Sequence, residues 1–137
     1  MKEKNIVCAL LVNDKNQVLL QDRKGISKYG EEWSFFWGGI EEWESSEQAL
    51  IRELSEELDW LPTAYSFLGE TKHEMRERDV LYHRYVYLVK IPLWIEWSDR
   101  EGAWAFLFAI DEIKNLKFNT PIDPELKLLY DNILISQ

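Results

Sequence analysis

A short acidic stretch holds the residues of this chain whose types and spacing could do chemistry. At about 100° of rotation per helical residue, Glu53, Glu56 and Glu57 fall within roughly 100° of arc. Glu41 and Glu44 reach the same end of that helix from the preceding loop. Like charges at such spacings destabilise a helix by roughly 0.2–0.5 kcal/mol per pair, so the cluster is costly unless cations compensate it. Hard carboxylate oxygens, with no histidine or cysteine nearby in sequence, favour Mg²⁺ or Mn²⁺ over Zn²⁺.

The helix that would carry these glutamates is predicted from Ser45 or Ser46 to Leu58. A serine caps the exposed amides at its start. Leu50, Leu54 and Leu58 form a neighbouring stripe that can be buried, which would leave the carboxylates at the edge of the packed face. A solvated acidic helix face is the alternative interpretation, and helix geometry alone leaves the two about equal.

The rest of the chain supplies strands and two more helices. Apolar and aromatic runs predict strands at Asn5–Val12, Val18–Gln21, Trp33–Trp37, Thr63–Thr71, Val80–Lys90 and Trp104–Ile110, with Trp94–Trp97 as a further sheet segment. Helices are predicted at Asp111–Asn115 and Asp123–Ile135. This mixture lacks the regular alternation of a parallel doubly wound fold, so it indicates an α+β protein with a mixed sheet between helices.

Composition narrows the function classes. A length of 137 residues suits one domain, residues 1–137. The net charge of −9 argues against non-specific nucleic-acid binding, and it would also repel a polyphosphate unless a cation mediates. One cysteine excludes an intrachain disulfide and fits a reducing compartment. No run approaches the roughly 18 apolar residues of a membrane span, so the cytoplasm is expected and a membrane partner is not.

The full spacing of the acidic segment is more specific than its charge. Gly38 is followed after five residues by Glu44, and after seven more by Arg52-Glu53-Leu54-Ser55-Glu56-Glu57-Leu58-Asp59-Trp60. This resembles the Nudix box, G-x5-E-x7-R-E-U-x-E-E-x-G-U, where U is a bulky apolar residue. Every fixed position matches except the last glycine, which is Asp59 here. The stretch 38–45 also looks like the family variant G-G-I-E-E-G-E-S.

The resemblance implies a fold, an activity and roles for the box residues. The expected fold is a Nudix-type α/β/α sandwich with a mixed β-sheet. The expected activity is hydrolysis of nucleoside diphosphates linked to another group, with Mg²⁺ as the cofactor and Mn²⁺ able to substitute. Glu53, Glu56 and Glu57 would hold the metal ions. Arg52 would orient these carboxylates, and Glu44 would support the loop.

Residues outside the box also resemble family positions. Glu101 precedes a stretch similar to the family's E-G-x4-W-F-x-x-D-E-U, which implies a metal ligand or general base, with Glu96 as its competitor. Arg23 stands where some relatives bind a phosphate, although a solvated loop is equally consistent. Asn119, two residues before Pro121, resembles the asparagine with which MutT-type enzymes contact a purine. A turn or helix-capping role is the alternative for it.

Three positions depart from the family pattern. Asp59 replaces a glycine that usually takes the left-handed conformation, at modest cost because aspartate visits that region more readily than most residues. Trp37 and Trp43 replace glycines of the variant, and Trp43 could reshape the loop or cover the site. Core packing is predicted for most of the aromatic residues that could form a stacking platform: Trp33, Phe35, Phe36, Tyr85 and Tyr87. A structural role is predicted for Cys8, His73 and His83.

Three functions follow from these patterns. The leading hypothesis is a MutT-like nucleotide pyrophosphatase that splits a nucleoside triphosphate into a monophosphate and pyrophosphate. A hydrolase of a nucleoside diphosphate sugar or related conjugate would use the same ions. A non-catalytic, ligand-sensing Nudix domain is the third hypothesis, and its mark would be loss of box glutamates, none of which is lost. The sequence leaves a homodimer open.

Overall fold

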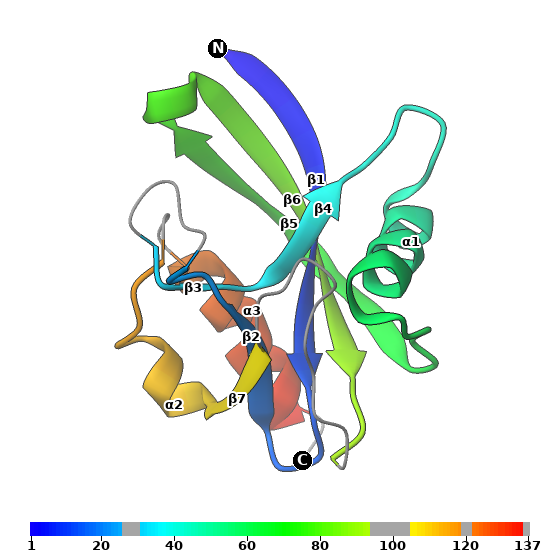
Figure 1. Ribbon diagram of the computed structural model, residues 1–137, viewed down its shortest axis with the longest axis vertical. Coiled ribbons are helices and arrows are strands. Elements are labelled where there is room, and N and C mark those ends of the chain that lie inside the picture. Colours follow the sequence, from blue (N-terminus) through cyan, green and yellow to red (C-terminus); the bar gives the residue numbers. More distant parts are fainter. Residues whose placement is uncertain (26–30, 94–104, 119–121, 136–137) are drawn as a thin grey trace.

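The centre of the sheet is strand β1 (Lys2–Val12). The computed structural model describes residues 1–25, 31–93, 105–118 and 122–135. Strand β1 pairs in parallel with β6 (Val80–Lys90) along its whole length. On its other side it pairs antiparallel with β2 (Gln17–Asp22) and, further toward its start, with β4 (Phe36–Gly39). The apolar, β-branched content of β1 and β6 suits strands that are covered on both faces (Figure 1).

The outer strands complete one mixed sheet. Strand β5 (Tyr65–Met75) pairs antiparallel with β6, and the short 3₁₀ turn η1 (Arg76–Arg78) connects the two strands. Strands β3 (Trp33–Ser34) and β7 (Ala105–Ala109) both pair with β2. The mixture of one long parallel pair with antiparallel neighbours confirms the predicted α+β class.

Alternation along β1 sends successive side chains to two separate cores. One core contains Val7, Ala9 and Leu11 and is covered by α1 (Ser46–Leu58). The other contains Cys8 and Leu10 and is covered by α2 (Ile110–Ile113) and α3 (Asp123–Ile135). The helices therefore lie on opposite faces of the sheet, which confirms the expected α/β/α sandwich (Figure 1).

Several predicted boundaries are wrong at their ends. Strand β1 begins at Lys2 because its pairing with β6 continues to Val80, beyond the apolar run that predicted it. Strand β5 ends at Met75 rather than Thr71, since its alternating polar end also pairs with β6. The predicted strand Trp33–Trp37 is divided at Phe35, because its first part pairs with β2 and its second part pairs with β1.

Both long helices confirm their predicted bounds, whereas α2 begins at Ile110, one residue earlier than predicted, and ends at Ile113, two residues earlier. Strand β7 covers Ala105–Ala109 of the predicted strand Trp104–Ile110. The predicted segment Trp94–Trp97 lies outside the described residues.

Candidate functional site

Helix α1 is fixed at both ends by its own sequence. The Ser45 hydroxyl accepts the Gln48 N–H, and the Gln48 side chain accepts the Ser45 N–H, so the two residues form a capping box. At the other end Asp59 has φ 51° and ψ 42°, and its N–H donates to the Ser55 carbonyl. The left-handed conformation predicted for Asp59 is therefore confirmed. The stripe of Leu50, Leu54 and Leu58 is buried as predicted, which fixes the rotation of α1 about its axis.

Arg52 joins the carboxylates of the helix to the loop before it. Its Nη1 donates to Glu53 Oε1 at 2.9 Å and to Glu56 Oε2 at 3.4 Å. Its Nε donates to Glu44 Oε2 at 3.1 Å, and its Nη2 donates both to Glu44 Oε1 and to the Gly39 carbonyl. The planar fork of arginine suits such divided bonding, which a lysine could not reproduce. These contacts agree with the orienting role expected of Arg52, and that role stays a prediction.

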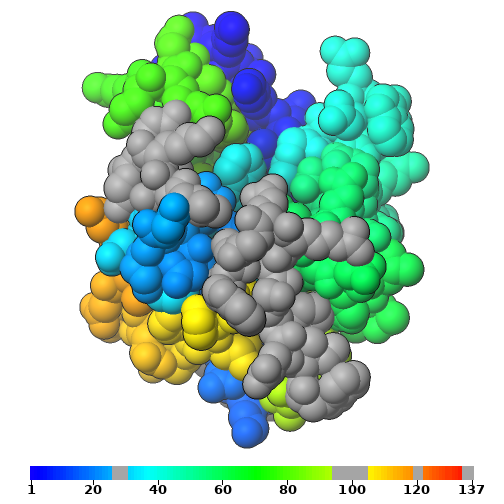
Figure 2. Space-filling model, in the orientation of Figure 1, coloured from blue at the N-terminus to red at the C-terminus, as the bar shows by residue number. Residues whose placement is uncertain are grey.

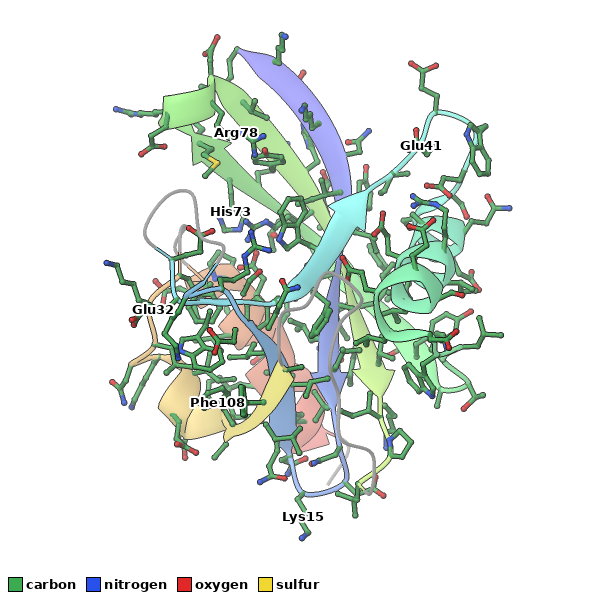
Figure 3. All side chains as sticks on the ribbon, in the orientation of Figure 1. Lys15, Glu32, Glu41, His73, Arg78 and Phe108 are labelled. Atoms are coloured by element: carbon green, nitrogen blue, oxygen red, sulfur yellow. The ribbon has the colours of Figure 1, made fainter. Side chains whose placement is uncertain are left out.

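Glu44 ties the loop to this arginine. Its side chain is only 1% exposed, and its Oε1 also accepts the backbone N–H of Glu41 at 2.9 Å. The hydrogen bonds from Arg52 hold the pKa of Glu44 below its usual range. Glu41 itself is exposed at the tip of the loop, where its side chain points away from α1 (Figure 3). Glu44 is thus placed to support the loop, whereas Glu41 reaches the cluster through its backbone.

Glu53 lies between α1 and strand β4. Its side chain is 18% exposed, and burial raises its pKa although Arg52 acts in the opposite direction. A Cβ atom at Gly38 of β4 would overlap the Cγ, Cδ and Oε1 atoms of Glu53. The first glycine of the box therefore leaves room for this carboxylate against the sheet.

The donor set at this helix suits a hard divalent cation. Glu44, Glu53, Glu56 and Glu57 offer carboxylate oxygens, and Arg52 supplies a single positive charge among them, so the cluster remains negative. Glu53 and Glu57 line a small hollow beside β4, whereas the Glu56 side chain is 60% exposed. Within the described ranges, no three His, Cys, Asp or Glu side chains are arranged as a ligand set for a metal ion. The carboxylate donors thus fit Mg²⁺ by their chemistry and not by their present arrangement, and the ligand roles stay predictions.

A larger hollow, partly open to solvent, lies on the opposite face of β4 and β1. Aromatic and apolar side chains line most of it, and Arg78 and Arg84 supply positive charge. Its described lining comprises Ile6, Cys8, Ser34, Phe35, Trp37, Met75, Arg78, Tyr82, Arg84, Phe118 and Ile122.

Trp37 connects the hollow to the carboxylate helix. This residue is 42% exposed and lines the larger hollow, and the next residue along β4, Gly38, contacts Glu53. Successive residues of a strand are about 3.3 Å apart and face opposite sides of the sheet. A ligand in the hollow would therefore lie one strand away from the glutamates.

The remaining aromatic residues mainly pack the cores. Phe36 and Tyr87 are buried in the core beneath α1, and Trp33 packs edge-on against Phe108 at 4.7 Å between ring centroids. Of the aromatic residues considered for base stacking, Phe35 reaches the hollow. Trp43 is 75% exposed in the loop before α1. That loop and α1 form one side of the molecule, opposite β2, β7 and α2 (Figure 2).

Of the other predicted site residues, Arg23 is described but lies away from both hollows. The Nη1 of Arg23 donates to Gln21 Oε1 at 3.3 Å, and its Nε lies 3.8 Å from Glu31 Oε1. Arg23 is not among the described residues that line either hollow. Glu96, Glu101 and Asn119 lie outside the described residues.

The residues expected to be structural are all partnered or buried. Cys8 is buried, which raises its pKa to about 12. His73 is bonded to Glu125, and His83 is bonded to Glu3 and Glu70. Cys8 nevertheless lines the larger hollow, as do Arg78 and Arg84, which the sequence did not single out. The period of two along β6 places Tyr82 and Arg84 on one face, but the face of the hollow is known only from the fold.

Comparisons with known proteins agree with the fold and the box. A family model described as the NUDIX domain matches residues 2–129. The RNA pyrophosphohydrolase of Acinetobacter baylyi is 34% identical over 116 residues, which is 85% of this chain. The 8-oxo-dGTP diphosphatase of Escherichia coli is 26% identical over 131 residues, which is 94% of this chain and 100% of that protein.

The RNA pyrophosphohydrolases are longer proteins. The chain spans 64% of the length of the Acinetobacter relative and 55% of that from Haemophilus influenzae. Among solved structures, one from a study of MutT from Aliivibrio salmonicida and Vibrio cholerae superposes with a TM-score of 0.72 and 25% identity, covering 96% of this chain and 99% of that chain. In the described part of the chain, no helix is both long and apolar enough to cross a membrane.

Proposed function

The chain belongs to the NUDIX domain family, and from this membership we propose that it is a Mg²⁺-dependent pyrophosphohydrolase acting on a nucleoside triphosphate. The reaction would cleave a diphosphate linkage and release a nucleoside monophosphate and pyrophosphate. The intact set of box glutamates and the similarity to a nucleotide diphosphatase over that protein's full length support this proposal.

The observation that carries the proposal is the position of the larger hollow relative to the carboxylates. Phe35, Trp37 and Phe118 line the hollow, and Trp37, which is 42% exposed, offers a ring on which a flat base can stack. Trp37 lines both this hollow and the small hollow that Glu53 and Glu57 line, so the phosphates of a nucleotide bound beside Trp37 would lie within reach of the box glutamates. The base and the scissile linkage would thus be held on either side of Trp37.

The residues of the chain divide the chemical task. Glu53, Glu56 and Glu57 would hold the divalent ion, which when bound neutralises phosphate charge and activates a water molecule. Arg52 keeps Glu53 and Glu56 oriented and balances part of their charge. A box glutamate or Glu101 would accept the proton of the attacking water. This assignment also explains how a chain of net charge −9 could bind a polyphosphate.

A second candidate substrate is the triphosphorylated 5′ end of an RNA. The relatives at 34% identity are named RNA pyrophosphohydrolases, and the same bond would be cleaved in both substrates. The net charge of −9 favours the free nucleotide, because long-range attraction of an RNA backbone is absent.

A substrate panel with Mg²⁺ tests the proposal. Free nucleoside triphosphates, a nucleoside diphosphate sugar and a 5′-triphosphorylated oligonucleotide would be compared by kcat/KM, with products identified by chromatography. We expect monophosphate and pyrophosphate from the free triphosphates, with a higher kcat/KM than for the oligonucleotide. A higher value for the oligonucleotide would instead favour the second candidate.

Matched variants test the metal ligands. Glu53→Gln and Glu57→Gln are each expected to lower kcat by on the order of a hundredfold or more. Glu47→Gln makes the same change on the same helix, at an exposed residue that accepts a hydrogen bond from Tyr65, and should leave kcat unchanged. Full activity in EDTA, or in both ligand variants, would contradict the metal role.

Other expectations from the sequence remain part of the proposal. These are one domain over residues 1–137, phosphate binding by Arg23, base contact by Asn119 and a metal-site or base role for Glu101. The three residue roles are open to test by the same panel after substitution of Arg23 or Asn119 to alanine and of Glu101 to glutamine.

A further inference from the structure

A buried polar cluster lies behind the wall of the larger hollow. Glu125 of α3 is fully buried, and its Oε1 accepts hydrogen bonds from Thr71 Oγ1 at 3.1 Å and from Arg84 Nη1 at 3.0 Å. The same oxygen lies 2.7 Å from His73 Nε2. Thr71 and Arg84 are register partners on β5 and β6, and His73 lies on the same part of β5 (Figure 3). A carboxylate from the helix is therefore inserted among polar side chains of two strands.

This carboxylate is held in its charged form. Burial alone would raise the pKa of Glu125, but His73 and Arg84 together lower it below its usual value. Apolar residues in place of a buried ion pair often leave the fold equally stable, so a contribution to stability does not by itself explain why this ion pair is present. The Oε2 atom of Glu125 also has no hydrogen-bond partner among the described residues, so bonding is concentrated on the oxygen that contacts Arg84. The arrangement fixes the orientation of that arginine.

Arg84 is the member of the cluster that reaches the hollow. It lines the hollow beside Trp37, Phe35 and Phe118, and its side chain is 14% exposed. An oriented guanidinium that lines the same hollow as an exposed tryptophan can read the edge of a stacked base by paired donation. Guanine presents two adjacent acceptors, N7 and O6, and arginine bonds both, whereas adenine presents a donor at N6.

We propose that Arg84, positioned by Glu125, determines the base specificity of the hollow by selecting a purine with adjacent acceptors at N7 and O6. This inference rests on the proposed function, since it specifies the substrate class of the same site. Guanine and hypoxanthine nucleotides meet the requirement. Adenine does not, and neither does 8-oxoguanine, whose N7 carries a hydrogen. Arg84 is the residue that contacts the base, and Glu125 is a positioning residue.

Equilibrium binding of nucleoside monophosphates tests the inference without requiring turnover. GMP, IMP, AMP, 7-deaza-GMP and 8-oxo-GMP would be titrated into the intact chain by calorimetry. GMP and IMP should bind with similar affinity, because they differ only at the 2-amino group. AMP, 7-deaza-GMP and 8-oxo-GMP should each bind about tenfold or more weakly, because each lacks one of the two acceptors.

Variants then separate base contact from positioning. Arg84→Lys keeps the charge beside Glu125 but loses the paired donors, so the preference for GMP over AMP should fall to about threefold or less. Glu125→Gln should reduce the same ratio, and Glu125→Asp should restore part of it. Glu70→Gln is the matched control, because it makes the same change at an exposed carboxylate of β5 that bonds His83 rather than Arg84, and it should keep the wild-type ratio. Thermal melting would show which variants are folded.

The outcomes distinguish this inference from the proposed function. Equal affinity for the five nucleotides, in a chain that hydrolyses triphosphates, would overturn the role of Arg84 and leave the proposed function standing. An unchanged GMP to AMP ratio in folded Arg84→Lys would do the same. An equal loss of preference in Glu70→Gln and Glu125→Gln would overturn the positioning role. The absence of both binding and hydrolysis would overturn the proposed function and this inference with it.

Discussion

Replacing Gly38 with alanine should displace Glu53 while leaving the backbone of β4 intact. The Gly38 backbone is outside the left-handed region, so an alanine fits its conformation, but the added methyl group would overlap three atoms of the Glu53 side chain. The adjacent Gly39 provides a matched control, because among the described residues, its two chain neighbours apart, no heavy atom lies within 4 Å of a Cβ atom built there. Both positions lie in β4, and the same substitution is made at each.

The expected magnitudes differ between the two variants. A glycine to alanine change that fits the backbone stabilises a protein by roughly 0.4–1 kcal/mol through the unfolded chain, and Gly39→Ala should show this gain or no change. At Gly38 the steric overlap should cost roughly 1–3 kcal/mol, so Gly38→Ala should be less stable than Gly39→Ala by about that amount. Glu53 would also lose its 2.9 Å bond from Arg52. A misplacement of about 1 Å at a catalytic group can cost on the order of a hundredfold in rate.

Denaturant unfolding and nucleotide hydrolysis would be measured for both variants. The free energy of unfolding should fall in Gly38→Ala alone, and kcat/KM should fall by about a hundredfold in Gly38→Ala alone. Equal stability and equal activity in the two variants would refute the claim that Gly38 makes room for Glu53. A stability loss without an activity loss would place Glu53 outside the catalytic machinery.

Three further predictions concern metal binding, pH and thiol reactivity. Millimolar Mg²⁺ should raise the melting temperature, because the ion binds the folded state, and the rise should be smaller in Glu57→Gln. An unchanged melting curve, together with no heat of binding by calorimetry, would contradict the metal site. The hydrogen bond to Glu3, and to a lesser extent that to Glu70, raises the pKa of His83 above 6.5. The stability from this pairing is therefore fully present below pH 6.5 and is lost as the pH rises through the raised pKa. The free energy of unfolding of the wild type relative to His83→Gln should therefore be larger at about pH 6 than at about pH 9, and a pH-independent difference would count against the pairing. Burial and a pKa of about 12 should keep Cys8 unreactive toward a thiol reagent until the chain unfolds, which a labelling time course at increasing denaturant would check.

Local sequence predicted the parts of the site that local interactions determine. The capping serine, the leucine stripe and the left-handed Asp59 all act within or next to α1, so their spacing was sufficient. The contact between Arg84 and Glu125 joins a strand to a helix through tertiary packing, and neither residue carries a local signal for it. The exposed tryptophan at position 37 likewise acquired its place in the hollow only through the pairing of β4 with β1.

Non-local pairing also explains why some of the predicted strand bounds were wrong. The aromatic run Trp33–Trp37 reads as one strand, but its residues pair with two different partners. The polar end of β5 has no pattern that separates it from a loop, and it is a strand because β6 runs alongside it. Strand ends are thus determined by the partner, which a single sequence does not reveal.

The parallel pairing of β1 with β6 has a consequence for biosynthesis. Lys2 pairs with Val80 and Val12 pairs with Lys90, so during synthesis β1 waits for a partner strand that follows it far along the chain. Contacts so distant in sequence slow folding, because a long loop must close before they form. Until then the apolar residues of β1 from Ile6 to Val12, which are buried in the folded protein, stay exposed on the nascent chain. This strand is therefore the segment through which the unfinished protein would aggregate or bind a chaperone.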